Sequence, residues 1–366
     1  MTTSTTPNRK HLLLLGAGRA HVRVLKNLAR LGTGDISVTL IAVHPQFIES
    51  AMLAGFIARQ YTSEDLCVPL ARLVEESGVG SMLAQVRALD PAARQVQLAN
   101  GNALPYDLLS IDIEPDADRA VFEAAIPGAR QHALFVRPNA AFLRLWPRLC
   151  DLAGARALHV AVIGETLAAA ELAMTAAPVL AVPHGSRITW IAGNTQDKPL
   201  LPGEPPKLAQ RVLARLKRLN VTVLQDNCVG LDGNSAQLAS GASLQCDAPV
   251  IASDTGYPAW LLQSGLQLTE SGAPQVNERL QSESHRQVFI VPPDASAEYG
   301  PALDANLRAA LYGGAFSAAP KVKRLHATAS GEGQAIAVWG PFGLEGRAVW
   351  RWLNRRNRKQ LAALFA

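Results

Sequence analysis

The chain has 366 residues, of which 48% are hydrophobic and 18% are charged, and its net charge is +5. This composition excludes a disordered protein, and the length allows about two domains with filled cores. No apolar run reaches the roughly 18 residues that a membrane span needs, so we expect no transmembrane helix.

The polar N-terminal segment 1–10 precedes a short apolar run that leads into a glycine turn and not into a cleavage site. We therefore expect no signal peptide and a cytoplasmic protein. The cysteines lie far apart and lack the spacing of a metal site or a redox dithiol, so we expect reduced, buried thiols and no metal. They are Cys67, Cys150, Cys228 and Cys246.

The first third of the chain has the pattern of a βαβ unit. An apolar run at 11–16 precedes a helical pattern, and a second apolar run follows at 36–42. Continuous apolar runs that alternate with helices indicate parallel strands buried on both faces. A helix is predicted at 63–76, and the Asn100-Gly101 pair predicts a hairpin with a type I′ turn.

The same pattern returns about 150 residues later. Strands are predicted at 158–164, 187–191 and 221–225, with helices between them, and further strands at 248–253 and 287–291. A helix containing 303–311 follows, and the last 45 residues indicate a hairpin and a basic helix.

We therefore predict an α/β protein with two Rossmann-like domains, the second inserted in the first, and a C-terminal hairpin and helix. The first, FAD-binding domain is placed at 1–115 and 245–320. The second, NAD(P)-binding-like domain is placed at 116–244. The C-terminal hairpin and basic helix are placed at 321–366.

A glycine-rich turn between the first strand and the first helix is the strongest cofactor signal. A glycine after the strand permits the tight turn, and the next one lets backbone amides approach a diphosphate at the helix N-terminus. A histidine stands where a third glycine is usual, and a plain strand–helix turn is the alternative interpretation. The turn consists of Gly16, Ala17, Gly18, Arg19, Ala20 and His21.

Two further positions bear on nucleotide binding. His44 lies at the end of the second strand, where a carboxylate usually binds the ribose; it is either a ligand or a structural histidine. The second turn lacks two glycines and has an acid beside the phosphate position. Two interpretations therefore remain: either this domain binds NAD(P)H, or it has kept its fold and lost its ligand. This turn consists of Gly164, Glu165, Thr166 and Leu167.

Two segments of the sequence are rich in charged residues. We expect the acidic residues after the strand at 106–113, which are Asp112, Glu114, Asp116 and Asp118, to form a solvated loop. The segment 347–359 contains six basic residues, two tryptophans and no acid. It suits either a packed helix with a solvated face or contact with an anionic membrane at the inner membrane face.

These segments together resemble the FAD-dependent pyridine nucleotide-disulfide oxidoreductase superfamily. The likeness is greatest to type II NADH dehydrogenase-like proteins, including those fused to selenide, water dikinase. It covers nearly the whole chain, from HLLLLGAGRAHVRVL through FIESAMLAGFIARQYTSEDL, YDLLSIDI and LDANLRAAL to AIAVWGPFGLEGRAVWRW.

The resemblance implies FAD in the first domain, with Met52, Val86 and Asp294 beside it, and NAD(P)H in the second. Hydride would pass from the nicotinamide to the flavin and then to a quinone or another acceptor. The chain departs from the family at Glu114, where a glycine is usual, and at the Pro292-Pro293 pair before Asp294.

Three functional hypotheses follow. The first is an FAD-dependent NAD(P)H oxidoreductase with a small-molecule electron donor and acceptor. The second is a degenerate homologue that acts as a non-catalytic binding or scaffold subunit. The third keeps FAD but takes electrons from a partner protein or an unusual substrate, so that NADH would leave the flavin oxidised. We expect no nucleic-acid partner, and a homodimer is compatible with the sequence.

Overall fold

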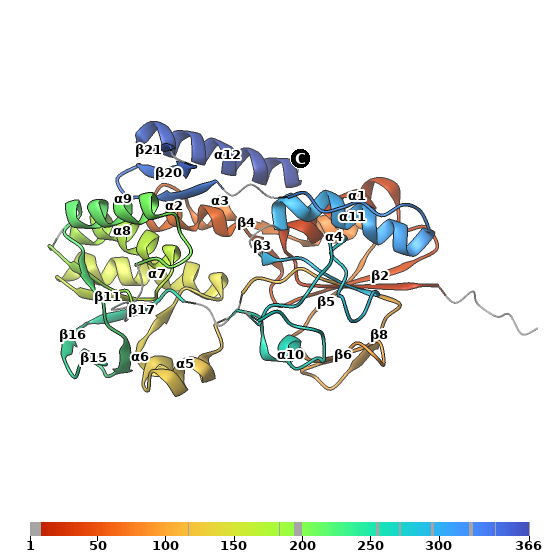
Figure 1. The fold of residues 1–366 in the computed structure, drawn as a ribbon, viewed down its shortest axis with the longest axis horizontal. Coiled ribbons are helices and arrows are strands. Elements are labelled where there is room, and N and C mark those ends of the chain that lie inside the picture. Colours follow the sequence, from red (N-terminus) through yellow and green to blue (C-terminus); the bar gives the residue numbers. More distant parts are fainter. Residues whose placement is uncertain are drawn as a thin grey trace, which may run out of the picture.

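Two domains lie side by side in the computed structural model, and a C-terminal unit lies across both (Figure 1). Each domain is built on a five-stranded parallel sheet, which confirms the predicted α/β fold. The structure describes residues 9–115, 117–182, 184–193, 200–253, 256–270, 272–293, 296–321, 325–340 and 342–365.

The first sheet has the strand order β18-β9-β1-β2-β5. Its strands are β1 (His11–Leu15), β2 (Ser37–Ala42), β5 (Gly80–Leu83), β9 (Leu108–Ile111) and β18 (Val288–Ile290). Leu12 and Leu14 of β1 belong to one apolar cluster, whereas Leu13 and Leu15 belong to another. Both faces of β1 are therefore buried, which explains its unbroken apolar run.

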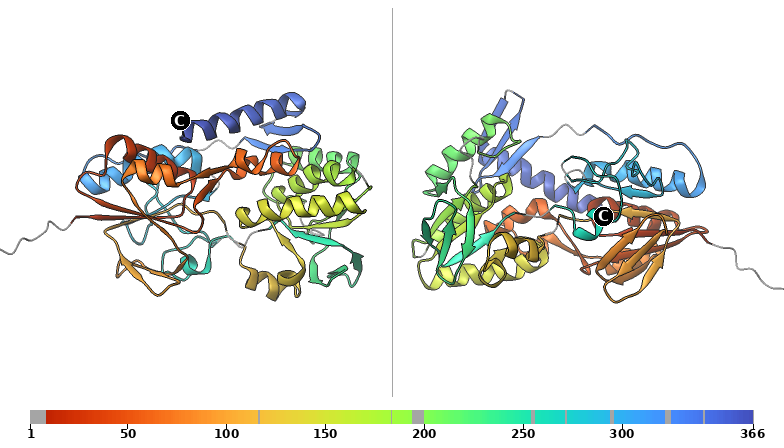
Figure 2. Two further views of the ribbon diagram at one scale, coloured as in Figure 1. Left: turned by 180° about the vertical axis from the view of Figure 1, so that it is seen from behind. Right: turned by 60° about the horizontal axis from the view of Figure 1, so that its bottom comes forward.

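Different layers cover the two faces of this sheet (Figures 1 and 2). One face packs against α1 (Arg19–Leu31), α4 (Ala71–Ser77) and α11 (Ser296–Tyr312). The other face packs against α10 (Ala259–Leu262) and an antiparallel sheet of β6 (Val86–Asp90), β7 (Gln95–Leu98) and β8 (Ala103–Pro105).

The second sheet has the order β10-β17-β11-β12-β13. Its strands are β10 (Leu134–Phe135), β11 (His159–Ile163), β12 (Arg187–Ile191), β13 (Thr222–Leu224) and β17 (Ala248–Ile251). Since β18 returns to the first sheet, the second domain is inserted in the first, as predicted. The boundary at 245 is wrong, because β17 pairs with β11 and not with the first sheet.

The layers around the second sheet repeat those of the first. One face packs against α7 (Asn139–Ala155), α8 (Leu167–Ala181) and α9 (Pro206–Arg218). On the other face lie α5 (Arg119–Ala125), α6 (Ala129–His132) and the antiparallel strands β14 (Cys228–Leu231), β15 (Ser235–Leu238) and β16 (Ser243–Gln245).

Two local predictions need correction. The helix predicted at 63–76 is divided into α3 (Ser63–Leu66) and α4 by β4 (Cys67–Pro69), which pairs with β3 (Gln46–Ile48); Pro69 cannot continue a helix hydrogen-bond pattern. The β7–β8 turn is closed by a hydrogen bond from the Gly101 N–H to the Leu98 carbonyl at 3.0 Å, so its central residues are Ala99 and Asn100. Neither has the positive φ that a type I′ turn requires, and Gly101, which has one, is the fourth residue of the turn. Asn100 instead uses its side-chain oxygen to accept the Asn102 N–H at 3.0 Å.

The C-terminal unit joins the two domains. It consists of β19 (His326–Ala329), β20 (Ala335–Trp339), β21 (Phe342–Gly346) and α12 (Arg347–Phe365), so the predicted hairpin has a third strand. Its sheet packs on α8 and α9 of the second domain. Helix α12 runs from there to α1 and to η1 (Ser50–Met52), beside α2 (Leu53–Ile57) (Figure 2).

Trp190 ties β12 to the second turn and provides a test of this fold. Its indole is fully buried and donates a hydrogen bond to the Gly164 carbonyl at 2.7 Å. Trp190→Phe leaves that acceptor unpaired and should lower the free energy of unfolding in urea by about 1–3 kcal/mol. The control Trp352→Phe, at a side chain that is 48% exposed, should change it by less than about 0.5 kcal/mol. Equal effects of the two variants would contradict this assignment.

Candidate nucleotide cleft

The turn after β1 is shaped by close packing against the end of β9. Gly16 has a φ of +88°, and its N–H donates to the Ile41 carbonyl at 2.8 Å. A Cβ at Gly16 would overlap the main chain of Asp112, and one at Gly18 would overlap the Asp112 carboxylate. Both glycines are therefore required by this packing, in addition to any approach of a phosphate.

Asp112 holds the turn and the start of α1 together. It is 1% exposed, so the prediction that its segment forms a solvated loop is wrong at this residue. Its main-chain carbonyl accepts the Gly18 N–H at 3.1 Å, and its carboxylate accepts the His21 N–H at 3.0 Å. A carboxylate at a helix N-terminus is favourably placed, because the unpaired N–H groups there carry partial positive charge.

His21 fills the place of the third glycine. Its imidazole is fully buried between the Gly16 carbonyl, 2.7 Å from Nδ1, and the Ser110 hydroxyl, 2.8 Å from Nε2. Burial lowers the pKa of His21, against the opposing effect of the nearby Asp112 carboxylate, so the ring is neutral. A glycine at this position would let the helix and the strand pack closely. His21 instead links them by two hydrogen bonds.

A first cavity of about 460 Å³ lies over the carboxyl ends of β1, β2 and β9. Among the predicted residues, it is lined by Gly16, Ala17, Gly18, His44 and Val86. The structure therefore brings together the glycine turn and two positions that are 28 and 70 residues from Gly16 in the chain. Further lining residues, which the sequence did not single out, include Trp260 and Asn139.

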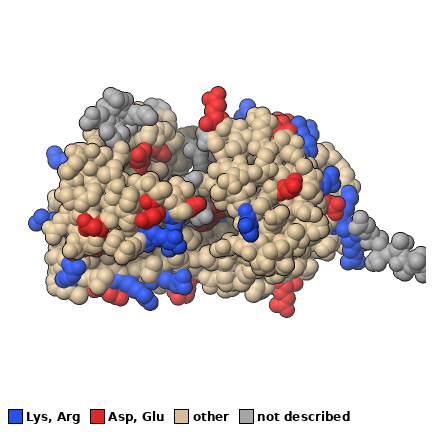
Figure 3. Space-filling view, turned by 90° about the horizontal axis from the view of Figure 1, so that it is seen from below, with Lys and Arg blue, Asp and Glu red and all other residues tan. Residues whose placement is uncertain are grey.

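A second cavity of about 380 Å³ continues from the first toward α12. The two cavities share a wall that includes Gly18, Asp112 and Glu114. Beyond this wall the second cavity is lined by residues from α1, η1, α8 and α12, namely Arg19, Glu49, Ser50, Ala51, Glu171, Arg356, Asn357 and Gln360. From below, the surface is visibly hollowed between the two domains, with charged side chains beside the hollow (Figure 3).

The shared wall is built around Glu114. Its carboxylate accepts hydrogen bonds from Arg137 at 2.7 Å, Asn139 at 3.2 Å and Ser50 at 3.3 Å. The Glu114 side chain is 42% exposed, but the protein around it partly desolvates the carboxyl and raises its pKa, and the Arg137 guanidinium opposes that rise. Glu114 therefore connects η1 of the first domain to the segment before α7 of the second.

Helix α12 closes the far side of the second cavity. Arg19 forms a buried ion pair with Glu49 and also donates to Gln360 of α12 at 3.3 Å. Asn357 is buried and donates to the Ala51 carbonyl at 3.0 Å. These contacts connect the glycine turn and η1 to the C-terminal helix across 341 and 306 residues of sequence, respectively.

Glu171 lies where the second cavity meets a third, of about 130 Å³, between the domains. Its carboxylate accepts the Ala329 N–H at 2.5 Å and the Thr328 hydroxyl at 3.0 Å. Burial raises the pKa of Glu171 despite these hydrogen bonds. The sequence shows Glu171 only as one acid in an alanine-rich helix, so its position between two cavities depends on domain packing.

The second turn differs from the first. The Glu165 side chain lies against Gly193, just after β12, and so crosses the crevice between β11 and β12. Thr166 is the N-cap residue of α8, makes no side-chain capping bond and lines the third cavity. A carboxylate beside the helix N-terminus disfavours a diphosphate there, and these residues do not fit the diphosphate of NAD(P)H.

Some predicted site residues are buried outside the cavities. Ala20 is fully buried in α1, and Met52 is 1% exposed within the core cluster that includes α2 and α8, so neither lines the first or second cavity. Ser50 and Ala51 line the second cavity where Met52 was expected. Leu167 is half-buried at the start of α8. Asp294 lies outside the described residues.

Within the described ranges, no group of three or more His, Cys, Asp or Glu side chains could hold a metal ion. The four cysteines are free, and Cys67 is only half-buried. None of the helices in the described part of the chain is both long enough and apolar enough to cross a membrane.

The sequence and fold were compared with known proteins. A sequence family described as pyridine nucleotide-disulphide oxidoreductase matches residues 10–291. The sulfide-quinone reductase of Aquifex aeolicus (strain VF5) is 28% identical over 106 residues, which are 29% of this chain and 24% of that relative. A type II NADH:quinone oxidoreductase of Staphylococcus haemolyticus (strain JCSC1435) is 30% identical over 105 residues, 28% of this chain and 26% of that relative. The matched segments thus span about a quarter of the length of these relatives.

Solved structures resemble the fold over nearly the whole chain. The sulfide:quinone oxidoreductase of Aquifex aeolicus has a TM-score of 0.77 at 16% identity and covers 97% of this chain and 91% of its own. The NDH2 of Plasmodium falciparum in complex with NADH has a TM-score of 0.73 at 14% identity and covers 98% and 97%. At these identities the likeness concerns the fold.

The neutral, buried His21 generates a pH prediction. In the unfolded chain His21 becomes protonated near pH 6.5, whereas burial in the folded chain disfavours its protonation. The contribution of His21 to the free energy of unfolding is therefore complete above that pH and is lost as the pH falls. Between pH 7.5 and 5.5 the wild type should therefore lose up to about 1.4 kcal/mol more unfolding free energy than His21→Gln. Urea unfolding at both pH values measures this, with His184→Gln at an exposed site as control. Equal losses in the wild type and His21→Gln would exclude the neutral-histidine interpretation.

Proposed function

The chain belongs to the pyridine nucleotide-disulphide oxidoreductase family, and from this premise we propose that it is an FAD-binding oxidoreductase. It would pass electrons from a small-molecule donor to a quinone or another acceptor. The observation that supports this best is the pair of adjoining cavities along the carboxyl edge of the first sheet. In open parallel sheets, ligands bind at that edge, where the connections after two adjacent strands lead in opposite directions. Here the connection after β1 leads to β2 and the chain after β9 returns to the sheet at β18, on the other side.

The residues of the first cavity fit the adenosine end of FAD. The Gly16–Gly18 turn opens onto it from the start of a helix, and His44 and Val86 lie on its walls. The rest of the cofactor would extend into the second cavity, which Arg19 and Arg137 line while each is paired with a carboxylate, that of Glu49 or of Glu114. FAD, when bound, would supply the capacity to accept and donate hydride or single electrons.

The chain's own residues would position the cofactor and exclude water. Asn357 and Gln360 of helix α12 line the second cavity, so that the helix borders the space beside η1 on that side. Glu171 has a raised pKa where the second and third cavities meet, and is suited to hold a proton there. A carboxyl group in that state can exchange a proton with a substrate without bulk water.

The second turn bears on the identity of the electron donor. NAD(P)H is the donor that the family resemblance implies, but the Glu165 side chain and Thr166 do not fit its diphosphate at the second turn. We therefore derive no step from a nicotinamide at Gly164.

A second candidate function is a non-catalytic binding or scaffold subunit, in which FAD is structural or absent. The specific observations that favour it are the acid at Glu165 and the carboxylate of Glu114 on the wall between the cavities. Both are acidic side chains close to positions where a dinucleotide would place its phosphates. The two functions differ in whether a reducible flavin is present.

The visible spectrum of purified protein separates these candidates. The oxidoreductase predicts a yellow protein whose flavin bands bleach with a reduced donor under anaerobic conditions and return when a quinone is added. NADH and NADPH should be tested side by side, with dithionite as the control that reduces any bound flavin. A colourless protein that takes up no added FAD would overturn the oxidoreductase, and a flavin that only dithionite reduces would favour the scaffold.

We also propose that the C-terminal unit contacts an anionic membrane surface. Four large apolar side chains are exposed on it: Trp339 at 67%, Phe342 at 72%, Leu344 at 68% and Trp352 at 48%. Arg351, Arg355 and Lys359 are exposed on the same helix as Trp352. Exposed aromatic residues beside basic ones suit a membrane interface, where indole rings lie at headgroup level and guanidinium groups meet phosphates.

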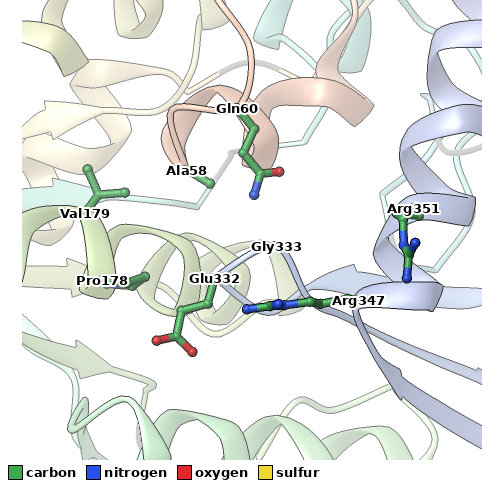
Figure 4. A pocket seen from close by; sticks show the side chains of 8 residues that line it. All are labelled: Ala58, Gln60, Pro178, Val179, Glu332, Gly333, Arg347 and Arg351. Carbon is green, nitrogen blue, oxygen red and sulfur yellow. The ribbon is translucent and has the colours of Figure 1, made fainter.

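A surface pocket of about 350 Å³ extends this basic region. It lies between the segment after α2, helix α8 and the start of α12, and Arg347, Arg351 and Gln60 are among its lining residues. Gln60 and Arg347 point into it (Figure 4). By contrast Trp350 is 9% exposed and packs beside the Tyr61 ring, so this tryptophan belongs to the packed face of α12.

Vesicle sedimentation tests the membrane proposal. The double variant Arg351→Ala/Arg355→Ala should bind vesicles that contain anionic lipid roughly 10- to 30-fold more weakly, since each basic residue near such a surface contributes about 1 kcal/mol. The matched control Arg87→Ala/Arg130→Ala removes the same charge from exposed sites on β6 and α6, on the opposite side of the molecule (Figure 1). Equal weakening by both pairs would leave only a net-charge effect and contradict the proposed surface.

A further inference from the structure

We propose that Glu114 acts as a gate between the two cavities, so that its ion pair with Arg137 limits how tightly this chain binds the diphosphate of FAD. The inference rests on the proposed function, because it concerns the same cleft. It identifies a specificity-determining residue: removal of the Glu114 carboxylate should favour ligands that carry a diphosphate over ligands that carry none.

The position of Glu114 supports this role. The residue lines both the first and the second cavity, on the wall that they share with Gly18 and Asp112. If a dinucleotide occupies both cavities, the group that links its two halves has to cross this wall. In FAD that part is the diphosphate, so its negative charge has to pass the Glu114 carboxylate.

The charges around the passage disfavour an anion while the ion pair is closed. Glu49 and Asp112 add two further carboxylates to that of Glu114 on the walls of the second cavity. Arg19 is engaged by Glu49, and Arg137 donates to Glu114 at 2.7 Å. At the shared wall a diphosphate can therefore gain Arg19 or Arg137 by competing with a carboxylate of the protein, whereas Arg356 lies elsewhere on the second cavity, 3.9 Å from Glu298.

The closed arrangement also leaves a polar atom unsatisfied. Asn139 is 2% exposed, and its amide nitrogen donates to Glu114 at 3.2 Å. Its carbonyl oxygen Oδ1 is buried and has no hydrogen-bond partner among the residues that the structure describes. Buried polar atoms are usually paired, so Asn139 Oδ1 lacks a hydrogen-bond donor. A second arrangement of Glu114 and Arg137, or a ligand hydroxyl, would supply that donor.

The protonation of Glu114 gives the gate a pH dependence. Partial desolvation on the cavity wall raises the pKa of this 42% exposed carboxyl, the Arg137 guanidinium acts against that rise, and the nearby Glu49 and Asp112 carboxylates act with it. A raised pKa means that the carboxyl becomes neutral at a higher pH than an ordinary glutamate. Binding of a diphosphate should therefore strengthen as the pH falls from 7.5 to 5.5, and more so in the wild type than in a variant without this carboxyl.

The experiment measures binding of FAD, ADP and adenosine to flavin-free full-length protein by calorimetry. Glu114→Gln keeps the size of the side chain and removes its charge, and it should tighten FAD and ADP binding at least tenfold while adenosine changes less than twofold. The control Glu298→Gln removes a carboxylate from the second cavity but not from the shared wall, and should change all three ligands less than threefold. Arg137→Gln is a second, opposite variant, which should weaken FAD and ADP at least tenfold and leave adenosine unchanged.

The outcomes separate the gate from the proposed function. Equal FAD affinity in the wild type and Glu114→Gln overturns the gate and leaves the FAD function standing. FAD binding to Glu114→Gln alone supports the gate and overturns FAD as the native cofactor. Absence of FAD binding in both proteins overturns both. If Glu114→Gln does not fold, unchanged FAD and ADP affinities in Arg137→Gln overturn the gate by themselves.

Discussion

The packing of Asp112 against the glycine turn is the contact on which the rest of the cleft depends. The end of β9 comes so close to the turn that neither Gly16 nor Gly18 has room for a Cβ. The Asp112 carboxylate then fixes the first turn of α1 through the His21 N–H. Because His21 in turn reaches back to Gly16 and Ser110, strand, turn and helix form one hydrogen-bonded unit in which no residue can be enlarged independently.

From this unit the cleft extends in two directions under different physical conditions. Toward β2 the walls combine apolar side chains with His44, which suits a flat, weakly polar ligand group. Toward α12 the walls contain carboxylates and guanidiniums in ion pairs, so anything charged that enters there competes with existing pairs. The C-terminal helix completes this second half, which means that the cleft needs both domains and the C-terminal unit in place.

The two βαβ units show how one fold keeps or loses a ligand position. Both domains have a parallel sheet, helices on one face and an antiparallel layer on the other. In the first domain, the small residues of the turn leave an open cavity. In the second, the Glu165 side chain lies across the crevice, and the Trp190 indole donates a hydrogen bond to the Gly164 carbonyl. The fold survives both because the apolar strands determine it, whereas the ligand position depends on a few residues at the strand ends.

The sequence by itself determined the two α/β domains, the insertion of one in the other, the first glycine turn and the family. Each depends on local patterns: buried strands give unbroken apolar runs, and a turn with positive φ favours glycine. It assigned β17 to the wrong domain and expected Asp112 in a solvated loop, because strand pairing and burial arise between residues far apart in the chain. Only the tertiary structure brought Glu114, Arg137 and Glu171 to the cavities. The Glu114–Arg137 ion pair joins segments of two domains, and the raised pKa values of Glu114 and Glu171 come from the protein packed around them.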